Sequence, residues 1–488
     1  MARRYYHKTR SYAWLWWLLL TALLVYGGWR LYNRWFVFNP QAILEDAILK
    51  EKNFDTEVKE ITSPKAKIKA YLFQDKTNPI ISINFLFKNA GLSTDETQQS
   101  GISTMVTKLM YLGFNCIMYN DIHLQHISAG NLDSQQFKEI LEQKAVGMGF
   151  SADMDDFSGH LLTTRENMNT AFKMLNMAMT QPRFDEEDIR RTKAQMLAAL
   201  KRQTEHPSGV LALEAAKEIF GKHPYARNPV GDAAAIAKIG RPQLLEFVRN
   251  HLSKSNLMVG IAGDVSEEEA GKIVDALFGS LPESGRIVFV REAEIDFDGH
   301  VKNISLPSAQ VVSSFAAKGI GRTHPDFYPL FIANHILGGS GLSSRLSTAA
   351  REKEGLTYGI DTYLSLLDKA PMLRGGFSAT PDNFARVVEI VRRQWAEMGR
   401  KGVSEEELAE AKDYLIASYN LRFASIDTIS AILVYMQKDN LGLDFLQKRN
   451  DYVRQVKLKD VNRVAREYFN PEKMIFVNVG SFEKQGVR

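Results

Sequence analysis

The chain has 488 residues, 45% of them hydrophobic and 24% charged, so it can bury a substantial core and is too long for one ordinary domain. Six of its 61 Lys and Arg residues lie in the first 38 positions, which hold no acid, and the remainder is close to neutral. The net charge of +4 therefore comes from the N-terminus, which excludes a basic, nucleic-acid-binding body. The one cysteine, Cys116, excludes an internal disulfide.

The N-terminal segment has the pattern of a membrane anchor. Nineteen uncharged residues, SYAWLWWLLLTALLVYGGW, lie between Arg10 and Arg30, and as a helix they would span roughly the 30 Å of a bilayer core. Four basic residues precede this run and two follow it, which places the N-terminus in the cytoplasm and the body outside, most simply in a bacterial periplasm. We predict a cytoplasmic tail and signal anchor over 1–38, spanning at 11–29, and a linker over 39–54. A cleaved signal peptide is the open alternative.

The first elements of the body are a strand and an amphipathic helix. Residues 80–90 (IISINFLFKNA) have the β-branched, alternating character of a strand. In the stretch SGISTMVTKLMYLG (100–113) apolar residues recur at helical spacing and predict a face packed on a core. The apolar positions are Ile102, Met105, Val106, Leu109 and Met110, and the opposite face carries Thr104, Thr107, Lys108 and Tyr111.

The body contains an internal duplication. Segments that begin at Glu166, Phe184, Ile239 and Leu257 resemble, in the same order and at an offset near 217 residues, segments that begin at Asp382, Val403, Val456 and Ile475. Each copy combines strands, such as 309–319, with helices that begin in acidic residues, such as 185–203 and 404–420. We predict an α+β fold with two homologous domains over 55–285 and 286–488, each a mostly antiparallel sheet packed with helices, preceded by one transmembrane helix. The Gly, Pro and charge-rich stretch 282–301 is the expected connection.

Three motifs then indicate a family. The strand, the loop and the helix opening G-I-x-x-x-V-x-x-L-M at Gly101 resemble the start of the insulinase/pitrilysin-type (inverzincin) metalloproteases, which include the mitochondrial processing peptidase. HPYARNPVG (223–231) resembles the H-P-Y-x-x-P-x-G segment of that family, and GDVSEEEAGKIVDALFGSLP (263–282) resembles the close of its first domain. The resemblance covers about residues 55–482 and includes the duplication.

The zinc motif of that family is missing. Its H-x-x-E-H helix binds zinc through two histidines, and the glutamate is the general base. These positions correspond here to Thr104, Thr107 and Lys108, and the third ligand, a later glutamate, corresponds to Ala198 or Ala199. The resemblance therefore implies no catalytic zinc in this chain. His123 and His126, in an apparent insertion over 114–128, have no acid or third ligand in their motif and are more simply solvent-facing residues.

The second domain keeps its own motif. GGSGLSSRLSTAAREKEGLTYGI (338–360) resembles the family segment in which an arginine and a tyrosine seven residues apart face the zinc site, here Arg351 and Tyr358. Such side chains can hydrogen-bond the scissile carbonyl and the oxyanion that develops on it. The alternative is a solvated charged helix end followed by a core tyrosine. The glycine-rich start is not a phosphate-binding loop, because it lacks the spacing and the following Lys-Ser/Thr.

The resemblance implies a zinc-less subunit that pairs with an H-x-x-E-H subunit, the zinc being held by that partner. Arg351 and Tyr358 would act in trans on an extended peptide or unfolded protein, bound as an added strand at a sheet edge. Two other classes stay open: a non-catalytic scaffold or peptide holder of the same fold, and an independent metallopeptidase with relocated ligands.

Overall fold

The computed structural model describes residues 57–110, 128–286 and 288–482, all of which belong to the compact unit Asn53–Arg488. The predicted anchor at 11–29, Cys116 and the histidines at 123 and 126 lie outside the described residues. Within the described ranges, no helix has the length and apolar character needed to cross a membrane.

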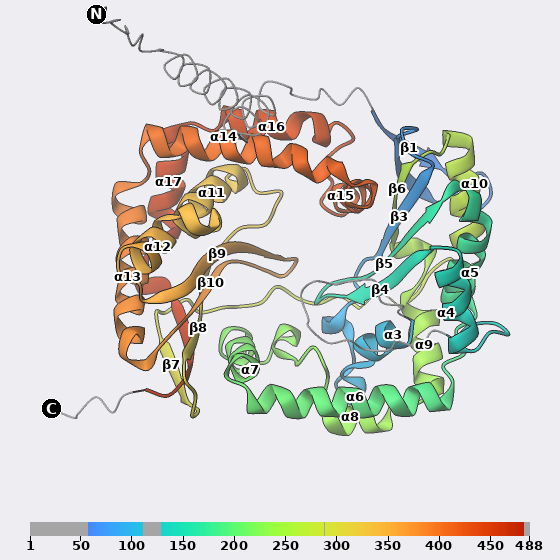
Figure 1. Cartoon of the computed structure of the whole chain (residues 1–488), viewed down its shortest axis with the longest axis horizontal. Helices are drawn as coiled ribbons and strands as arrows, with labels where there is room; N and C mark the ends of the chain where they lie inside the picture. Colours follow the sequence, from blue (N-terminus) through green and yellow to red (C-terminus); the bar gives the residue numbers. More distant parts are fainter. Residues whose placement is uncertain (1–56, 111–127, 287, 483–488) are drawn as a thin grey trace, which may run out of the picture. The chain divides into compact units, whose positions relative to one another are not determined.

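The first domain is an α+β assembly whose predicted elements are confirmed (Figure 1). The strand expected at 80–90 is β3, the amphipathic helix is α3, and the helix expected at 185–203 is α6. Its elements are β1 (Val58–Thr62), β2 (Lys69–Gln74), β3 (Ile80–Phe87), α3 (Ile102–Met110), α4 (Ser134–Gln143), β4 (Gly147–Ala152), β5 (Phe157–Thr164), α5 (Met168–Thr180), α6 (Glu186–Glu205), α7 (Pro207–Phe220), α8 (Ala233–Lys238), α9 (Arg241–His251), β6 (Leu257–Gly263) and α10 (Glu267–Phe278).

The second domain repeats this plan after a connection, 279–300, whose described residues form no helix or strand. Its elements are β7 (Val301–Ser305), β8 (Val311–Lys318), α11 (Phe327–Asn334), α12 (Arg345–Ser347), β9 (Thr357–Leu367), β10 (Ala370–Ala379), α13 (Pro381–Lys401), α14 (Glu405–Leu421), α15 (Ile426–Lys438), α16 (Phe445–Gln455), α17 (Leu458–Tyr468) and β11 (Ile475–Gly480). The predicted helix at 404–420 is α14, which begins in a capping box: Ser404 and Glu407 each accept the other's backbone N–H.

The two sheets have corresponding strand orders. The first runs β1-β2-β6-β3-β5-β4 and the second β7-β11-β8-β10-β9. Apart from β1, the orders match strand for strand, and the one parallel pair falls at the same place, β2 with β6 and β7 with β11. The other pairs are antiparallel. The chain is therefore α+β with two sheet-containing domains, and the matching order is what an internal duplication predicts.

Each sheet is also covered by a helix from the other domain. α15 packs on β6, β3 and β2 of the first sheet, and α7 packs on β11 and β8 of the second (Figure 1). The approach of α15 is close, since a Cβ on Gly260 of β6 would lie 2.3 Å from the carbonyl oxygen of Ser430. Polar bonds fix it: Ser82 donates to Asp427 at 2.9 Å, and Asn84 donates to Ser430 at 2.7 Å. As a result consecutive residues of β3 are buried, because both faces of the strand are covered; a strand with one solvent-facing side would bury only alternate residues.

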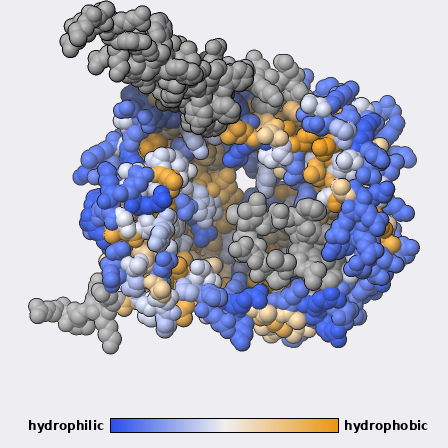
Figure 2. Space-filling view, viewed as in Figure 1, coloured by the Kyte–Doolittle hydropathy of each residue, from blue (hydrophilic) through white to orange (hydrophobic). Residues whose placement is uncertain are grey.

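The larger cores lie on the opposite faces of the sheets. In the first domain the apolar stripe of α3 packs against β4 and α9, and all five predicted stripe residues are at most 3% exposed. In the second domain Trp395 of α13 packs edge-on against Phe315 of β8. Figure 2 shows hydrophilic residues over the outer helices α5 and α10, whose other faces are buried.

Candidate functional site

The helix that replaces the zinc helix, α3, is anchored by a buried carboxylate. Asp95 is 5% exposed, and its carboxylate accepts the N–H of Gly101 at 2.9 Å and the hydroxyl of Ser103. Burial raises the pKa of Asp95 to about 6 in spite of these hydrogen bonds. Gly101 and Gly231 have φ of +94° and +102° and meet backbone to backbone; a Cβ on either would lie within 2.6 Å of a carbonyl oxygen across the contact.

The segment HPYARNPVG holds α3 in place. Arg227 donates to the carbonyl oxygens of Ser93, at 3.1 Å, and of Asp95. Asn228 donates to Gln203 of α6 at 2.8 Å. The hydroxyl of Thr104, at the first ligand position, donates to the carbonyl of Pro229 at 2.5 Å. The segment therefore joins α3 to α6, and its Pro229 carbonyl accepts the hydroxyl of Thr104 at the former first-ligand position.

The other positions of the zinc motif offer no ligand set either. Thr107 is 8% exposed and donates to the carbonyl of Thr104 at 2.8 Å, while Lys108 is half-buried. Ala198 and Ala199 lie on α6, which packs against α3, so the fold still brings the third-ligand position to this helix. In the described ranges, no group of three or more His, Cys, Asp or Glu is placed to hold a metal ion. The fold keeps the scaffold of the site without its donor atoms.

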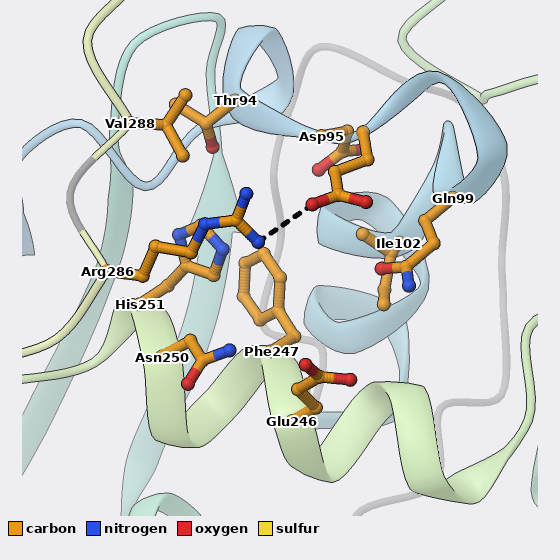
Figure 3. A pocket seen from close by; sticks show the side chains of 11 residues that line it. Thr94, Asp95, Gln99, Ile102, Glu246, Phe247, Asn250, His251, Arg286 and Val288 are labelled. Atoms are coloured by element: carbon orange, nitrogen blue, oxygen red, sulfur yellow. Dashed lines mark hydrogen bonds and ion pairs between the residues drawn. The ribbon is translucent and has the colours of Figure 1, made fainter.

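A small cavity of about 60 Å³ lies beside the start of α3 (Figure 3). Arg286 of the connection crosses it to pair with Glu96 at 2.7 Å, and Asp95 and Ile102 line the α3 side. On α9, the His251 ring stacks on Phe247 with 4.5 Å between centroids, and burial lowers the pKa of His251 to about 4. The cavity has room for a water molecule or two and is too small for a peptide substrate. We therefore interpret it as a packing gap between α3, α9 and the connection.

The predicted arginine and tyrosine lie at the two ends of a turn. Arg351 is in a π-helical turn, Thr348–Glu352, and Tyr358 is the second residue of β9, an edge strand. Gly355, at φ +64°, turns the chain between them, and Thr357 donates to the carbonyl of Ser378 at 2.7 Å to fix the start of β9. Arg351 is half-buried and Tyr358 is 87% exposed.

Neither side chain forms a hydrogen bond or an ion pair with the described part of the chain, and none joins one to the other. Tyr358 is not a core residue, so that part of the alternative interpretation is wrong.

A charged cluster that the sequence did not reveal joins the two domains. Lys438, at the end of α15, contacts Asp156 in the β4–β5 turn and lies 3.0 Å from Asp368 in the β9–β10 turn. Tyr225 of HPYARNPVG donates to Asp155, which also accepts the N–H of Asp368 at 3.0 Å. We call these five residues the Lys438 cluster.

Burial governs the charges of this cluster. The side chains of Lys438 and Asp156 are 9% and 1% exposed. Burial raises the pKa of Asp156 to about 6, although the charge of Lys438 opposes the shift. Burial by itself would lower the pKa of Lys438, but the nearby Asp156 and Asp368 carboxylates raise it. The cluster is thus a buried ion network that holds four separate segments together.

Comparisons with known proteins agree with this architecture. Residues 238–415 match the family described as "Peptidase M16 inactive domain". The "Non-peptidase homolog YmxG" of Helicobacter pylori is 23% identical over 421 residues, covering 86% of this chain and 93% of that protein. The "Uncharacterized zinc protease YmxG" of Bacillus subtilis is 24% identical over 312 residues, 63% of this chain and 74% of that protein.

Among solved structures, a peptidase M16 inactive domain from Pseudomonas fluorescens superimposes with a TM-score of 0.78 at 24% identity, covering 87% of this chain and 98% of that one. The likeness in structure is a likeness of fold. Taken with the duplicated sheets, the family match over α9 to α14 and the missing zinc ligands, it leads to one conclusion. Residues 238–415 match the peptidase M16 inactive-domain family, and the body as a whole is similar in sequence and fold to proteins described as inactive or non-peptidase members of it.

Proposed function

We propose that this chain is a membrane-anchored, zinc-less subunit that pairs with an H-x-x-E-H-bearing M16 subunit and supplies Arg351 and Tyr358 to peptide hydrolysis. The zinc and the general base belong to the partner. The guanidinium and the phenol of this chain would donate hydrogen bonds to the carbonyl oxygen of the scissile bond as negative charge develops on it. The anchor at 11–29 would hold the pair at the outer face of a bacterial inner membrane.

One observation carries this proposal: Tyr358 is almost fully exposed, and Arg351 has no hydrogen-bond or ion-pair partner among the residues that the structure describes. A tyrosine next to a strand start would gain by burying its ring, and an arginine near Glu352 and Glu354 would gain by pairing. Glu354 instead pairs with Arg386, at 2.9 and 3.0 Å. The two donors are therefore available to a group that comes from outside the fold.

The substrate would be an extended peptide that adds a strand to an open sheet edge. Backbone hydrogen bonds give such binding its affinity without strict sequence choice. Tyr358 lies on β9, an edge strand of the second sheet, so a peptide paired with β9 would run past its hydroxyl.

Arg351→Ala and Tyr358→Phe in the reconstituted pair test the proposal. Each should lower kcat for a quenched peptide by about 100-fold, the usual cost of removing one oxyanion donor, and leave the affinity between the subunits unchanged. The chain alone should be inactive with or without added zinc. The measurements are steady-state turnover and subunit affinity by calorimetry.

Arg386→Ala and Tyr414→Phe are matched controls, because Arg386 is a nearby arginine with an internal partner and Tyr414 is an exposed tyrosine of α14, 57% exposed. Both should keep full turnover. Unchanged turnover in Arg351→Ala and Tyr358→Phe would show that this chain takes no part in the chemistry.

The second candidate is a non-catalytic scaffold or peptide holder. The observation in its favour is the absence of every zinc ligand from a chain whose relative in Helicobacter pylori is named a non-peptidase homologue. In this role the chain would still bind the partner and the peptide but would contribute nothing to catalysis. Arg351→Ala and Tyr358→Phe therefore distinguish it from the first proposal.

A further inference from the structure

One face of the second sheet is partly covered by α7 and by Ala293, Ile295 and Phe297 of the connection. Ala316, Met372, Ile475 and Val477 of this face pack in one cluster with Ala215, Ile219 and Phe220 of α7. Directly opposed residues of antiparallel strands share a face, and so do alternate residues of one strand. Arg374, two residues after Met372 and opposite both Ala316 and Tyr363, therefore lies on this same face, at the margin of the α7 cover.

Arg374 has no partner in the described part of the chain. It is half-buried, and its Nε–H is shielded from solvent with no acceptor. A buried donor without an acceptor costs free energy, and an arginine carries five donors that suit a carboxylate. The fold therefore holds a guanidinium at this position without using its hydrogen-bonding capacity.

The neighbouring side chains set the charge that this face attracts. Lys318, opposite Met372, and Asp361, opposite Gly376, flank the Arg374 row on either side. Neither forms an ion pair in the described ranges, although Asp361 is a diagonal neighbour of Arg374. Two cations against one carboxylate on these strands favour an anionic ligand, and the 47% exposed Tyr363 leaves this end of the face open to solvent.

We propose that Arg374 is an anchor for a carboxylate of an extended peptide that lies along β9. This inference rests on the proposed function, in which the ligand of the chain is an extended peptide. Tyr358, Asp361 and Tyr363 all lie on β9, so one peptide strand would pass each of them. A strand added at β9 lies about 10 Å from β10, a gap that an arginine and a glutamate side chain span together. The carboxylate is either an acidic side chain or the C-terminus of the peptide.

Binding of labelled peptides to the full chain, followed by fluorescence anisotropy, tests this assignment. Three twelve-residue peptides differ only at one central residue and at the C-terminus. The first has a central Glu and an amidated C-terminus, the second has a central Gln and a free C-terminal carboxylate, and the third, neutral at both places, has a central Gln and an amidated C-terminus. The chain should bind at least one carboxylate peptide about tenfold more tightly than the neutral peptide, which is the usual strength of a hydrogen bond to a charged group. The arm that gains the affinity identifies the source of the carboxylate.

Arg374→Gln should abolish this preference and leave binding of the neutral peptide unchanged. Arg374→Lys should restore part of it, and Arg386→Gln, which removes an equal charge from an internal pair, should keep all of it. If Arg374→Gln still prefers a carboxylate peptide, or if the wild-type chain shows no such preference, the inference is overturned. The turnover assay of Arg351→Ala and Tyr358→Phe tests the proposed function independently of this result. Failure to bind any of the three peptides would overturn the anchor and the peptide-holding part of the proposed function together.

Discussion

A residue that replaces a zinc ligand still has to satisfy its own polar groups. Thr104 does so by donating to the carbonyl of Pro229, and Thr107 by donating to the turn before it. The former ligand positions have become part of the packing between α3 and the segment 223–231. Restoring histidines at 104 and 108 would remove the Thr104 bond without supplying the third ligand at 198, so the change from a metal site to a packed helix involves more than the motif itself.

Asp95 should give the protein a distinct pH dependence. Its pKa is about 6 in the folded chain because of burial, against 3.8 for the free side chain, so the folded state holds the proton more tightly. The stabilisation is present below pH 3.8 and is lost as pH rises through about 6. It amounts to at most about 3 kcal/mol of unfolding free energy. Asp95→Asn should therefore reduce the pH dependence of stability between 4 and 6.5 and leave the share that comes from Asp156.

Denaturant unfolding of wild type and variant across that range measures the difference. Asp232→Asn, which changes an exposed capping carboxylate at the start of α8, should keep the wild-type slope. A wild-type slope in Asp95→Asn would mean that Asp95 does not titrate in this window.

At the scale of the elements, the Lys438 cluster connects α15 to two hairpin turns. Lys438→Met would leave the buried Asp156 without its cation, and removal of one partner from a buried pair costs about 3–5 kcal/mol. We expect a clearly lower denaturation midpoint. Lys272→Met, which breaks an exposed pair with Glu268, should leave the midpoint nearly unchanged.

Replacing its two ion-pair partners as well, in Lys438→Met/Asp156→Asn/Asp368→Asn, should recover much of the lost stability, because the two carboxylates that pair with Lys438 lose their charge together with it. Equal midpoints for wild type and Lys438→Met would show that the network adds nothing to the joint between the domains.

The elements differ in how far the sequence predicts them. The helices α6 and α14 and the strands β3 and β8 follow from local patterns: helical spacing, acidic first turns and β-branched runs. The loss of the zinc ligands follows from motif spacing. Ser82, Asn84 and Gly260 looked like ordinary strand residues, and only packing with a helix some 170–350 positions later explains them. Arg374 and the Lys438 cluster were missed for the same reason, since strand pairing and tertiary contacts bring their neighbours together.

At the scale of the whole described unit, each domain depends on one helix of the other. A first domain made alone would lack α15 and leave the Ser82 and Asn84 face of β3 bare; a second domain made alone would lack α7. We expect residues 53–285 and 286–488 to be poorly folded when expressed separately and to assemble into a folded complex when expressed together. Circular dichroism and gel filtration of each fragment and of the pair check this. A fragment that melts cooperatively by itself would show that the exchanged helices are dispensable.

The reciprocal placement of α7 and α15 makes the molecule equivalent to a domain-swapped dimer whose two protomers have been fused. The connection over 279–300 is then a covalent tether that makes the association of the two halves intramolecular. Cutting it should change none of the contacts and yet make stability depend on protein concentration, because an intramolecular association becomes a bimolecular one.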